Sequence, residues 1–219
     1  VATSDATATE ENTPVTVIPV NFILNAYEMF KGCSQTSIID FAYFETTMIH
    51  NMSHMFDSCY DLTEIYNLSP VNAKDMSYSF SNCQKLNKID FIFPPSMVNT
   101  QVTNMENMFH YCYKLTSVNL ANINTNKVTN MKYMFGDCKI LNIVNLGDTF
   151  DFSSVTDMSY MFYNCQLLSE ITLINLNSET KIKYMNSLFY NCQQLTNINL
   201  NFDASNVINM EQLFRGCKN

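Results

Sequence analysis

The sequence predicts an α/β solenoid of eight stacked units, each a short helix followed by a short strand. Three observations lead to this prediction. A Phe-x-x-Cys string occurs eight times, with cysteines 24–29 residues apart. The residues before each cysteine follow a helical period, and those after it follow the alternating period of a strand. A repeat of this length builds stacked supersecondary units rather than one globular domain around a central active site.

The helical part of each unit is predicted from the spacing of its apolar residues. In the most regular copy, Met158, Met161, Phe162 and Cys165 stand at i, i+3, i+4 and i+7, which is one face of a helix. The residue before the first Met position is Asn or Asp in seven of the eight copies, and Tyr184 is the exception. Such a side chain can cap a helix by accepting a hydrogen bond from a free N–H group.

The strand part follows each cysteine. Apolar residues alternate there with polar ones, as in the run from Ile171 to Leu173, so one face of each short strand points inward. No unit can bury its apolar face alone. Stacked neighbours must therefore share one core, with the strands forming a parallel sheet.

The repeat resembles the BspA-like leucine-rich repeat family, whose core has the form M-x-x-M-F-x-x-C-x-x-L-x-x-I-x-L. The resemblance covers Asn25 to Cys217, which is nearly the whole chain. It implies a leucine-rich-repeat solenoid in a surface-exposed or secreted protein, with adhesion to host or matrix components as the usual activity. The resemblance implies no catalytic motif and no cofactor. Because its framework residues form the core, none of them transfers as a binding site.

Three segments divide the chain. Residues 1–14 form a polar tail of Thr, Ala, Ser and Glu, residues 15–24 a leading strand or N-terminal cap, and residues 25–219 the solenoid. The last repeat is incomplete, because the chain stops just after Cys217 without a strand. The leading strand could complete that half-unit in a neighbouring copy, and truncation of a longer parent protein explains the missing half equally well. The residues predicted to take part in such assembly are Val15, Val17, Val20, Phe22 and Cys217.

Composition excludes several classes of partner. The net charge is −8 and basic residues do not cluster, which argues against nucleic acid and anionic membranes. No apolar run is long enough to span a bilayer. Only 15% of residues are charged, and the abundant Asn, Ser and Thr suit an extracellular protein or cell-surface protein. The chain begins with Val1, as a mature form with its signal removed or an excised fragment would.

The eight cysteines raise the question of disulfides. The even count and an extracellular setting favour them. Position argues against them, because each cysteine is an inward residue and packed helices stand about 8–10 Å apart, beyond the usual Cα reach of a disulfide. We therefore expect buried free thiols that act as small apolar core residues.

Metal sites and enzyme sites are not expected. His50, His54 and Asp57 could share one helix face, but other copies place Tyr78 or Ser187 at the His54 position, which indicates a solvent-facing slot. Twelve of the fourteen methionines fall at the two core positions. The four glycines form no phosphate loop, and no G-x-S-x-G motif is present. The prediction is a non-enzymatic protein with no metal and no cofactor.

Partner-binding residues are predicted in three connections between a strand and the next unit. Exposed aromatic, Pro or Met side chains there would anchor an interface, and the alternative is that they fold back over the core. The residues are Phe93, Pro94, Pro95, Met97, Phe150, Phe152 and Phe202. Asn67, in an Asn-Leu-Ser triplet, is the predicted glycosylation site.

These observations together predict an extracellular recognition or adhesion protein that presents a repeat solenoid to protein or glycan partners. The alternative is a structural subunit that associates head to tail into a filament through the N-terminal segment and the incomplete last repeat.

Overall fold

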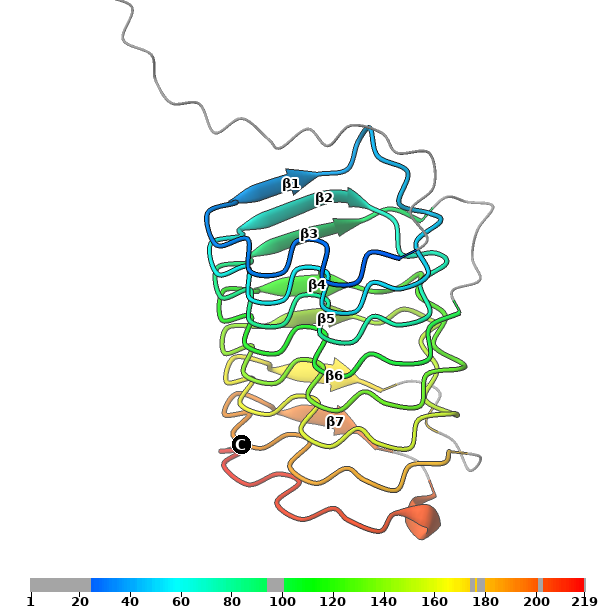
Figure 1. Ribbon diagram of the computed structural model, residues 1–219. Coiled ribbons are helices and arrows are strands. Elements are labelled where there is room, and N and C mark those ends of the chain that lie inside the picture. The colour runs from blue at the N-terminus through cyan, green and yellow to red at the C-terminus, as the bar shows by residue number, and fades with distance from the viewer. Residues whose placement is uncertain (1–24, 94–100, 174–175, 177–179, 201–202, 219) are drawn as a thin grey trace, which may run out of the picture.

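The computed structural model describes residues 25–93, 101–173, 176, 180–200 and 203–218. The chain winds into a stack of coils, with short strands along one side and a turn-rich segment along the other (Figure 1). We call these sides the sheet face and the turn face. The sheet face carries β1 (Ile38–Asp40), β2 (Glu64–Leu68), β3 (Lys88–Phe91), β4 (Ser117–Asn119), β5 (Ile143–Asn145), β6 (Glu170–Thr172) and β7 (Asn197–Asn199). A 3₁₀ turn, η1 (Ala204–Asn206), precedes the last coil segment.

The strands pair in parallel, as predicted. Equivalent residues lie opposite one another, for example Val118 and Val144 in β4 and β5, or Ile171 and Ile198 in β6 and β7. The strands form three short sheets, ordered β1-β2-β3, β4-β5 and β6-β7, instead of one continuous sheet. The parallel solenoid is therefore confirmed, while its sheet is interrupted twice.

A second ladder joins the coils at the start of the turn face. The Asn or Asp before each Met position forms a parallel bridge with its counterpart in the next coil, and Tyr184 takes this place in the seventh coil. The Asn and Asp side chains accept hydrogen bonds from the N–H two residues ahead, as in Asp157 Oδ1 with the Ser159 N–H at 2.8 Å. The predicted capping contact exists, but it closes an Asx turn and not a helix.

The predicted helices are wrong, because two residues in every turn segment have positive φ. These are the second residue after the first Met position and the second residue after the Phe, with φ between 54° and 84°. The resulting geometry is a pair of β-turns: the N–H of Met161 donates to the Met158 carbonyl at 3.3 Å, and that of Cys165 to the Phe162 carbonyl at 3.2 Å. No α-helix occurs anywhere in the described ranges.

Hydrogen bonding between coils explains why a helix does not form. Alternate N–H groups of each turn segment donate to the next coil, as from Met158 to the Tyr184 carbonyl at 2.9 Å and from Phe162 to the Leu188 carbonyl at 2.9 Å. Those donors are not available for bonds within a helix. Tandem turns nevertheless place residues i, i+3, i+4 and i+7 inward. The apolar spacing alone therefore cannot distinguish a helix from tandem β-turns.

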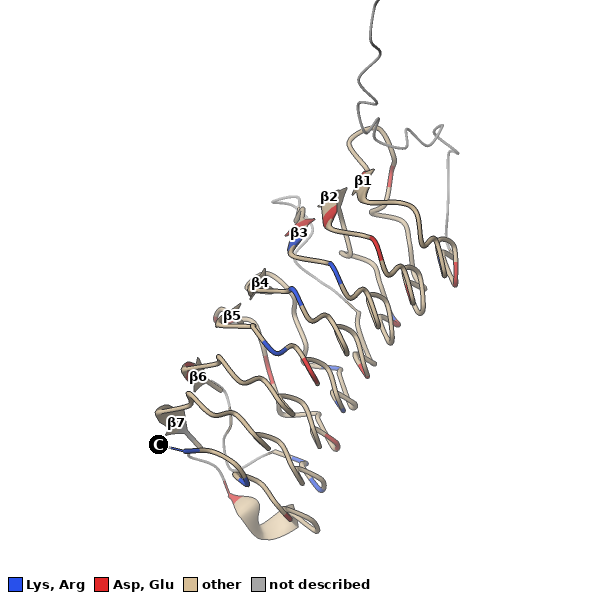
Figure 2. Cartoon of the chain, turned by 90° about the vertical axis from the view of Figure 1, so that its left-hand side faces the viewer, with Lys and Arg blue, Asp and Glu red and all other residues tan. Residues whose placement is uncertain are grey.

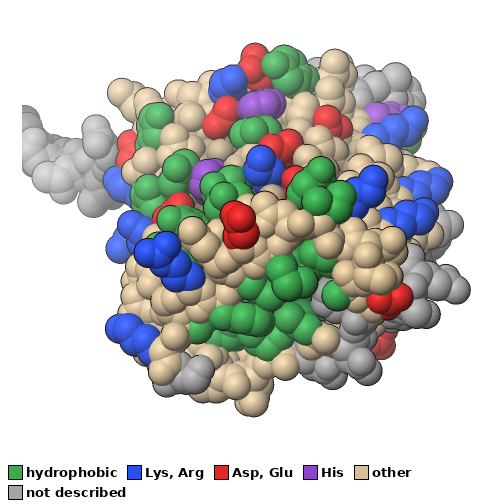
Figure 3. Space-filling model, turned by 90° about the horizontal axis from the view of Figure 1, so that it is seen from below, with side chains coloured by type: hydrophobic (Ala, Val, Ile, Leu, Met, Phe, Trp, Pro, Cys, Tyr) green, Lys and Arg blue, Asp and Glu red, His purple; other side chains and the backbone are tan. Residues whose placement is uncertain are grey.

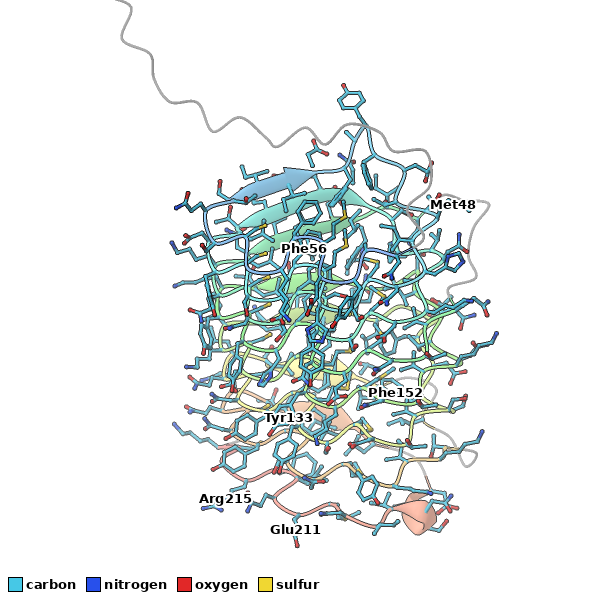
Figure 4. All side chains as sticks on the ribbon, in the orientation of Figure 1. Met48, Phe56, Tyr133, Phe152, Glu211 and Arg215 are labelled. Atoms are coloured by element: carbon cyan, nitrogen blue, oxygen red, sulfur yellow. The ribbon has the colours of Figure 1, made fainter. Side chains whose placement is uncertain are left out.

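The core is the one that the repeat predicts. The Phe rings of all eight units stack in a single column, with centroids 5.1–5.7 Å apart and planes within 11° of parallel. Figure 4 places Phe56 inside the stack. The Met and Leu positions of the inner coils pack around this column and are buried, while Ile89 and Val144 at the strand position are partly buried. A continuous apolar core therefore runs along the solenoid axis.

The cysteines lie in the core beside the Phe column. All eight are free, and six of them are buried. The Cys165 Sγ donates to the Phe135 carbonyl of the preceding coil at 3.1 Å, and the same contact recurs from Cys59 to Cys217. Burial raises the pKa of the Cys192 thiol to about 12. The thiols thus act as small core residues with one weak hydrogen bond each.

Segments 1–14 and 15–24 lie outside the described residues, as do Val15, Val17, Val20 and Phe22. The last coil runs to Lys218 without a following strand, and it leaves Met210 and Phe214 exposed by 47% and 43%. Figure 3, which looks along the stack from this end, shows a cluster of hydrophobic side chains there. Acidic and basic residues are spread along the coils in Figure 2.

Candidate functional site

The structure corrects two of the predicted partner-binding residues. Phe150 and Phe152 are fully buried and pack against each other with ring centroids 5.2 Å apart. Figure 4 labels Phe152. Their connection folds back over the core, so these rings do not form exposed anchors. Phe93 packs partly buried against the core beside Phe91. Pro94, Pro95, Met97 and Phe202 lie outside the described residues.

Asn67 lies at the end of β2 in the left-handed region, with φ of 59°. Its Nδ2 donates to Asp40 Oδ1 at 2.6 Å, so the amide that a glycan would occupy is engaged with a neighbouring coil. Cys217 lies partly buried in the last coil, where its Sγ contacts the Phe189 carbonyl at 3.2 Å.

In the histidine motif, His54 contacts Asp57 and an aromatic neighbour. His54 Nδ1 lies 2.9 Å from Asp57 Oδ2, while the His54 ring stacks on Tyr78 with centroids 4.6 Å apart. No group of three His, Cys, Asp or Glu side chains is placed to hold a metal ion within the described part of the chain. The pair therefore belongs to an aromatic surface, described next.

Tyrosines gather on the turn face. Of the chain's 12 tyrosines, nine fall between the first Met position and the residue after the cysteine in their unit. They are Tyr27, Tyr60, Tyr78, Tyr111, Tyr113, Tyr133, Tyr160, Tyr163 and Tyr190. The other variable positions of this face are mostly Ser, Asn, Gln, His and charged residues. We call this surface the tyrosine face.

The rings of the tyrosine face are ordered against one another. Tyr133 and Tyr160 stack with centroids 4.4 Å apart and planes 5° from parallel, and Tyr163 and Tyr190 stack at 4.9 Å. Tyr163 meets Tyr133 and Tyr160 edge to face, at angles of 67° and 62°. Such mutual contacts hold the rings in fixed positions. Figure 4 labels Tyr133 within this group.

A cavity of about 400 Å³ opens in the middle of the tyrosine face. Its lining residues are His110, Tyr111, Tyr133, Asp137, Tyr160, Tyr163 and Asn164. They come from three successive coils, and they combine aromatic rings with one carboxylate and one amide. A pocket with several aromatic walls and a few polar groups is the usual form of a binding site.

Asp137 is the charged group of this cavity. Burial alone would raise its pKa, but the nearby His110 ring and the hydrogen bond from Asn164 outweigh burial, and the net effect lowers the pKa. Asn164 Nδ2 donates to Asp137 Oδ1 at 2.6 Å. His110 Nε2 lies 3.7 Å from Asp137 Oδ2 and has no hydrogen-bond partner although it is buried. The carboxylate is therefore ionised at neutral pH, and one of its oxygens has room for a further donor.

The tyrosine hydroxyls remain protonated. Burial, followed by the neighbouring tyrosines, raises the pKa of Tyr133 to about 12, and burial raises the pKa of Tyr163 as well. These side chains therefore offer neutral hydroxyl groups and ring faces. The arrangement is suited to binding, and it contains no nucleophile paired with a base.

Sequence reasoning missed the tyrosine face. The sequence analysis predicts a solvent-facing slot at the His54 position, but no aromatic surface. The signal was present: the position occupied by His54 is Tyr in three other units, Tyr78, Tyr133 and Tyr160.

The fold is that of a leucine-rich-repeat-like solenoid, and comparisons with known proteins agree. The chain is similar to a leucine-rich repeat protein from Bacteroides ovatus, with 20% identity and a TM-score of 0.54 over 84% of this chain and 41% of that one. It is also similar to the T. pallidum leucine-rich repeat protein TpLRR, with 21% identity and a TM-score of 0.53 over 82% of this chain and 72% of that one. The chain thus spans about two fifths of the Bacteroides ovatus protein.

The family is shown by sequence. Residues 6–93, 95–180 and 171–219 match the family described as "Mycoplasma protein of unknown function, DUF285", and the chain belongs to it. Among curated proteins, none matches the sequence. In the described ranges no helix has the length and apolar character needed to cross a membrane.

Proposed function

We propose that this protein is a non-enzymatic recognition protein of the cell surface, and that it binds its partner through the tyrosine face. The observation that carries this proposal is the ordered set of tyrosines around the cavity at Asp137. Tyrosine is enriched at the energetic centres of protein interfaces, because it offers a large apolar area, a polar tip and few rotatable bonds. Ser and Asn around it resemble the composition of antibody binding loops.

The placement of four tyrosines supports the same proposal. Tyr78, Tyr111, Tyr133 and Tyr160 have φ of 57°, 64°, 54° and 60°. Bulky residues are uncommon in this region, where Gly or Asn fits with less strain. Positive φ is common to every turn segment, so the placement of Tyr at these positions, and not the backbone angle itself, supports recognition. Among the described residues outside the tyrosine face, the most exposed tyrosine, Tyr43 after β1, and the exposed Ile143 of β5 lie on different coils.

The test measures binding of the purified chain to cultured host cells and to an array of matrix proteins and glycans. One variant carries Tyr111→Ser and Tyr190→Ser on the tyrosine face. The matched control carries Tyr43→Ser and Ile143→Ser, which remove two exposed apolar side chains elsewhere. The proposal expects binding to fall at least about tenfold in the first variant, as for loss of an interface hot spot, and to persist in the control. Equal binding by both variants would refute it.

A second function, head-to-tail assembly, is favoured by the backbone groups of the first and last described coils. In the seventh coil, the N–H groups of Met185, Ser187, Phe189 and Asn191 donate to carbonyls of the last coil at 2.7–3.0 Å. The equivalent N–H groups of Met210, Gln212, Phe214 and Gly216 have no partner among the described residues.

The first coil offers the complementary row. The carbonyls of Asn25, Tyr27, Met29 and Lys31 correspond to those that accept in every later coil, and no described group donates to them. A second copy could therefore continue both the hydrogen-bond ladder and the Phe column. Sedimentation of the full chain over a concentration series tests this, with Phe214→Lys as the variant. Monomers at all concentrations would exclude assembly, while growth that Phe214→Lys abolishes would support it.

A further inference from the structure

The cavity on the tyrosine face lies next to a glycine in a regular column of side chains. The residue directly after each Phe forms this column, which reads His110, Gly136, Tyr163, Tyr190 and Arg215 from the fourth coil to the last. Gly136 contributes no side chain, and the rings of Tyr133 and His110 lie against its Cα, within 2.7 Å and 3.0 Å of where a Cβ would stand. The cavity is lined by His110 from the fourth coil, Asp137 from the fifth and Tyr163 from the sixth.

Tyr163 has one occupied side and one open side along the column. Tyr190 stacks on it from the seventh coil at 4.9 Å. On its other side the fifth coil has Gly136 in the column, and Tyr133 of that coil meets Tyr163 edge to face at 67° instead of stacking on it. Tyr163 thus presents part of a ring face to the cavity.

The same column already shows which group such a face accepts. At its end, the Arg215 guanidinium lies over the Tyr190 ring, 5.8 Å from the centroid. Nearby on the tyrosine face, Lys139 Nζ lies 4.7 Å from the centre of the Tyr113 ring. Cations over tyrosine rings are therefore a recurrent contact of this surface, and a planar guanidinium is well suited to stacking.

The floor of the cavity is complementary to the same group. Asp137 Oδ1 is taken by Asn164, while Oδ2 has only His110 Nε2 at 3.7 Å, longer than a hydrogen bond. A guanidinium lying on Tyr163 could donate to this oxygen, and charge-assisted bonds of this kind are the stronger class. The chain's net charge of −8 would draw a basic partner toward the surface.

We propose that the cavity between His110 and Tyr163 binds the guanidinium of an arginine presented by a protein partner, with Tyr163 stacking on it and Asp137 accepting its hydrogen bond. This inference rests on the proposed function of the tyrosine face and names the group recognised at its centre. A sugar would also meet rings and polar groups here, but the ionised carboxylate and the arginine–tyrosine contact in the same column favour a cation.

The experiment titrates the full ¹⁵N-labelled chain with Nα-acetyl-arginine methylamide and follows amide shifts by NMR. The citrulline analogue serves as the uncharged probe of the same shape, and methyl glycosides of common sugars serve as the alternative. We expect arginine to shift amides around Gly136, Asp137 and Tyr163, with citrulline binding about tenfold more weakly, as expected for loss of a cation–π contact. Equal binding of citrulline, or binding of a glycoside in place of arginine, would overturn the proposal.

Two variants locate the site. Gly136→Tyr adds a ring at this position, as in the two following units, to fill the cavity. The new Cβ would lie 2.7 Å from Tyr133 Cδ1 and 3.0 Å from His110 Cδ2, so both rings have to move. Asp137→Asn removes the charge without adding volume. Both should abolish the arginine shifts, whereas Asp90→Asn, an exposed carboxylate on β3, should leave them unchanged. Retention of the shifts in folded Asp137→Asn would refute the assignment.

The two proposals fail separately. If the tyrosine-face variants lose partner binding but arginine does not bind the cavity, the recognition surface stands and the arginine assignment is wrong. If arginine binds the cavity while Tyr111→Ser and Tyr190→Ser leave partner binding intact, the surface proposed for recognition is wrong.

Discussion

Replacing one ring of the Phe column by alanine should cost far more in the middle of the stack than at its end. Phe135 is fully buried and stacks on Phe109 at 5.5 Å and on Phe162 at 5.4 Å. Phe214 is 43% exposed and stacks only on Phe189, at 5.7 Å. The two positions have the same chemistry in the repeat, so their difference isolates burial and stacking.

The magnitude follows from these contacts. A buried Phe→Ala change costs about 3–5 kcal/mol, to which each lost aromatic pair contributes about 0.5–1.5 kcal/mol. Phe135→Ala loses two stacked partners and leaves a cavity that rigid neighbouring coils cannot fill. Phe214→Ala loses one partner and opens to solvent, so we expect about 1–2 kcal/mol there, in line with its partial burial.

Urea unfolding followed by circular dichroism and by tyrosine fluorescence measures both variants, since the chain has no Trp. Phe135→Ala should lower the midpoint by at least twice the shift of Phe214→Ala. It should also broaden the transition, because a weakened interface lets the two halves of a repeat stack unfold separately. Equal midpoint shifts would refute the single continuous column as the source of stability.

Three further predictions concern the turns, the thiols and Asp137. Gln212→Gly should be neutral or stabilising, because φ of 58° favours glycine. The neighbouring Glu211→Gly should cost about 1 kcal/mol in the same unfolding assay. A similar cost at both positions would support the predicted helix instead of the turns. In the native state, a maleimide should label Cys33 and Cys217 before the six buried thiols, as mass spectrometry of digests would reveal, and uniform labelling would contradict the buried positions. The lowered pKa of Asp137 stabilises the folded state above the ordinary value of 3.8, and this stabilisation is lost as the pH falls through the folded pKa. In Asp137→Asn, the free energy of unfolding should therefore fall less steeply below about pH 4. An unchanged pH dependence would contradict this.

The repeat made the core predictable, because each core position can be checked in several copies. Met158, Phe162 and Leu168 are buried as their spacing indicates, and the parallel strand pairs follow from the stacking of equal units. The helix was not predictable from the same spacing, since tandem turns give the same inward positions. A second signal could have separated them: the position two after the Phe is Gly, Ser, Asn or Asp in seven of eight units, with Tyr111 as the exception. Those are the residues that best tolerate positive φ.

The cavity depends on information that a single unit does not contain. Gly136 is unremarkable within its own repeat, and Asp137 is one of many acidic residues. Only when the coils stack in the observed register does the residue after each Phe become a column, and only then do His110, Asp137 and Tyr163 of three successive coils line one cavity. Register between units, and not the pattern within a unit, places the candidate site.

The tyrosines with positive φ affect both the stability of the fold and the proposed recognition surface. Holding a bulky residue at positive φ costs about 1–2 kcal/mol, and Asn107 occupies the equivalent position at φ of 55° with less strain. Stacking between Tyr133 and Tyr160 returns only about 0.5–1.5 kcal/mol for the pair, so these rings do not improve the fold over Asn. What they add is a set of rings fixed before a partner arrives, which lowers the entropy cost of binding. Because these tyrosines lower the stability of the fold, recognition explains them better than folding does.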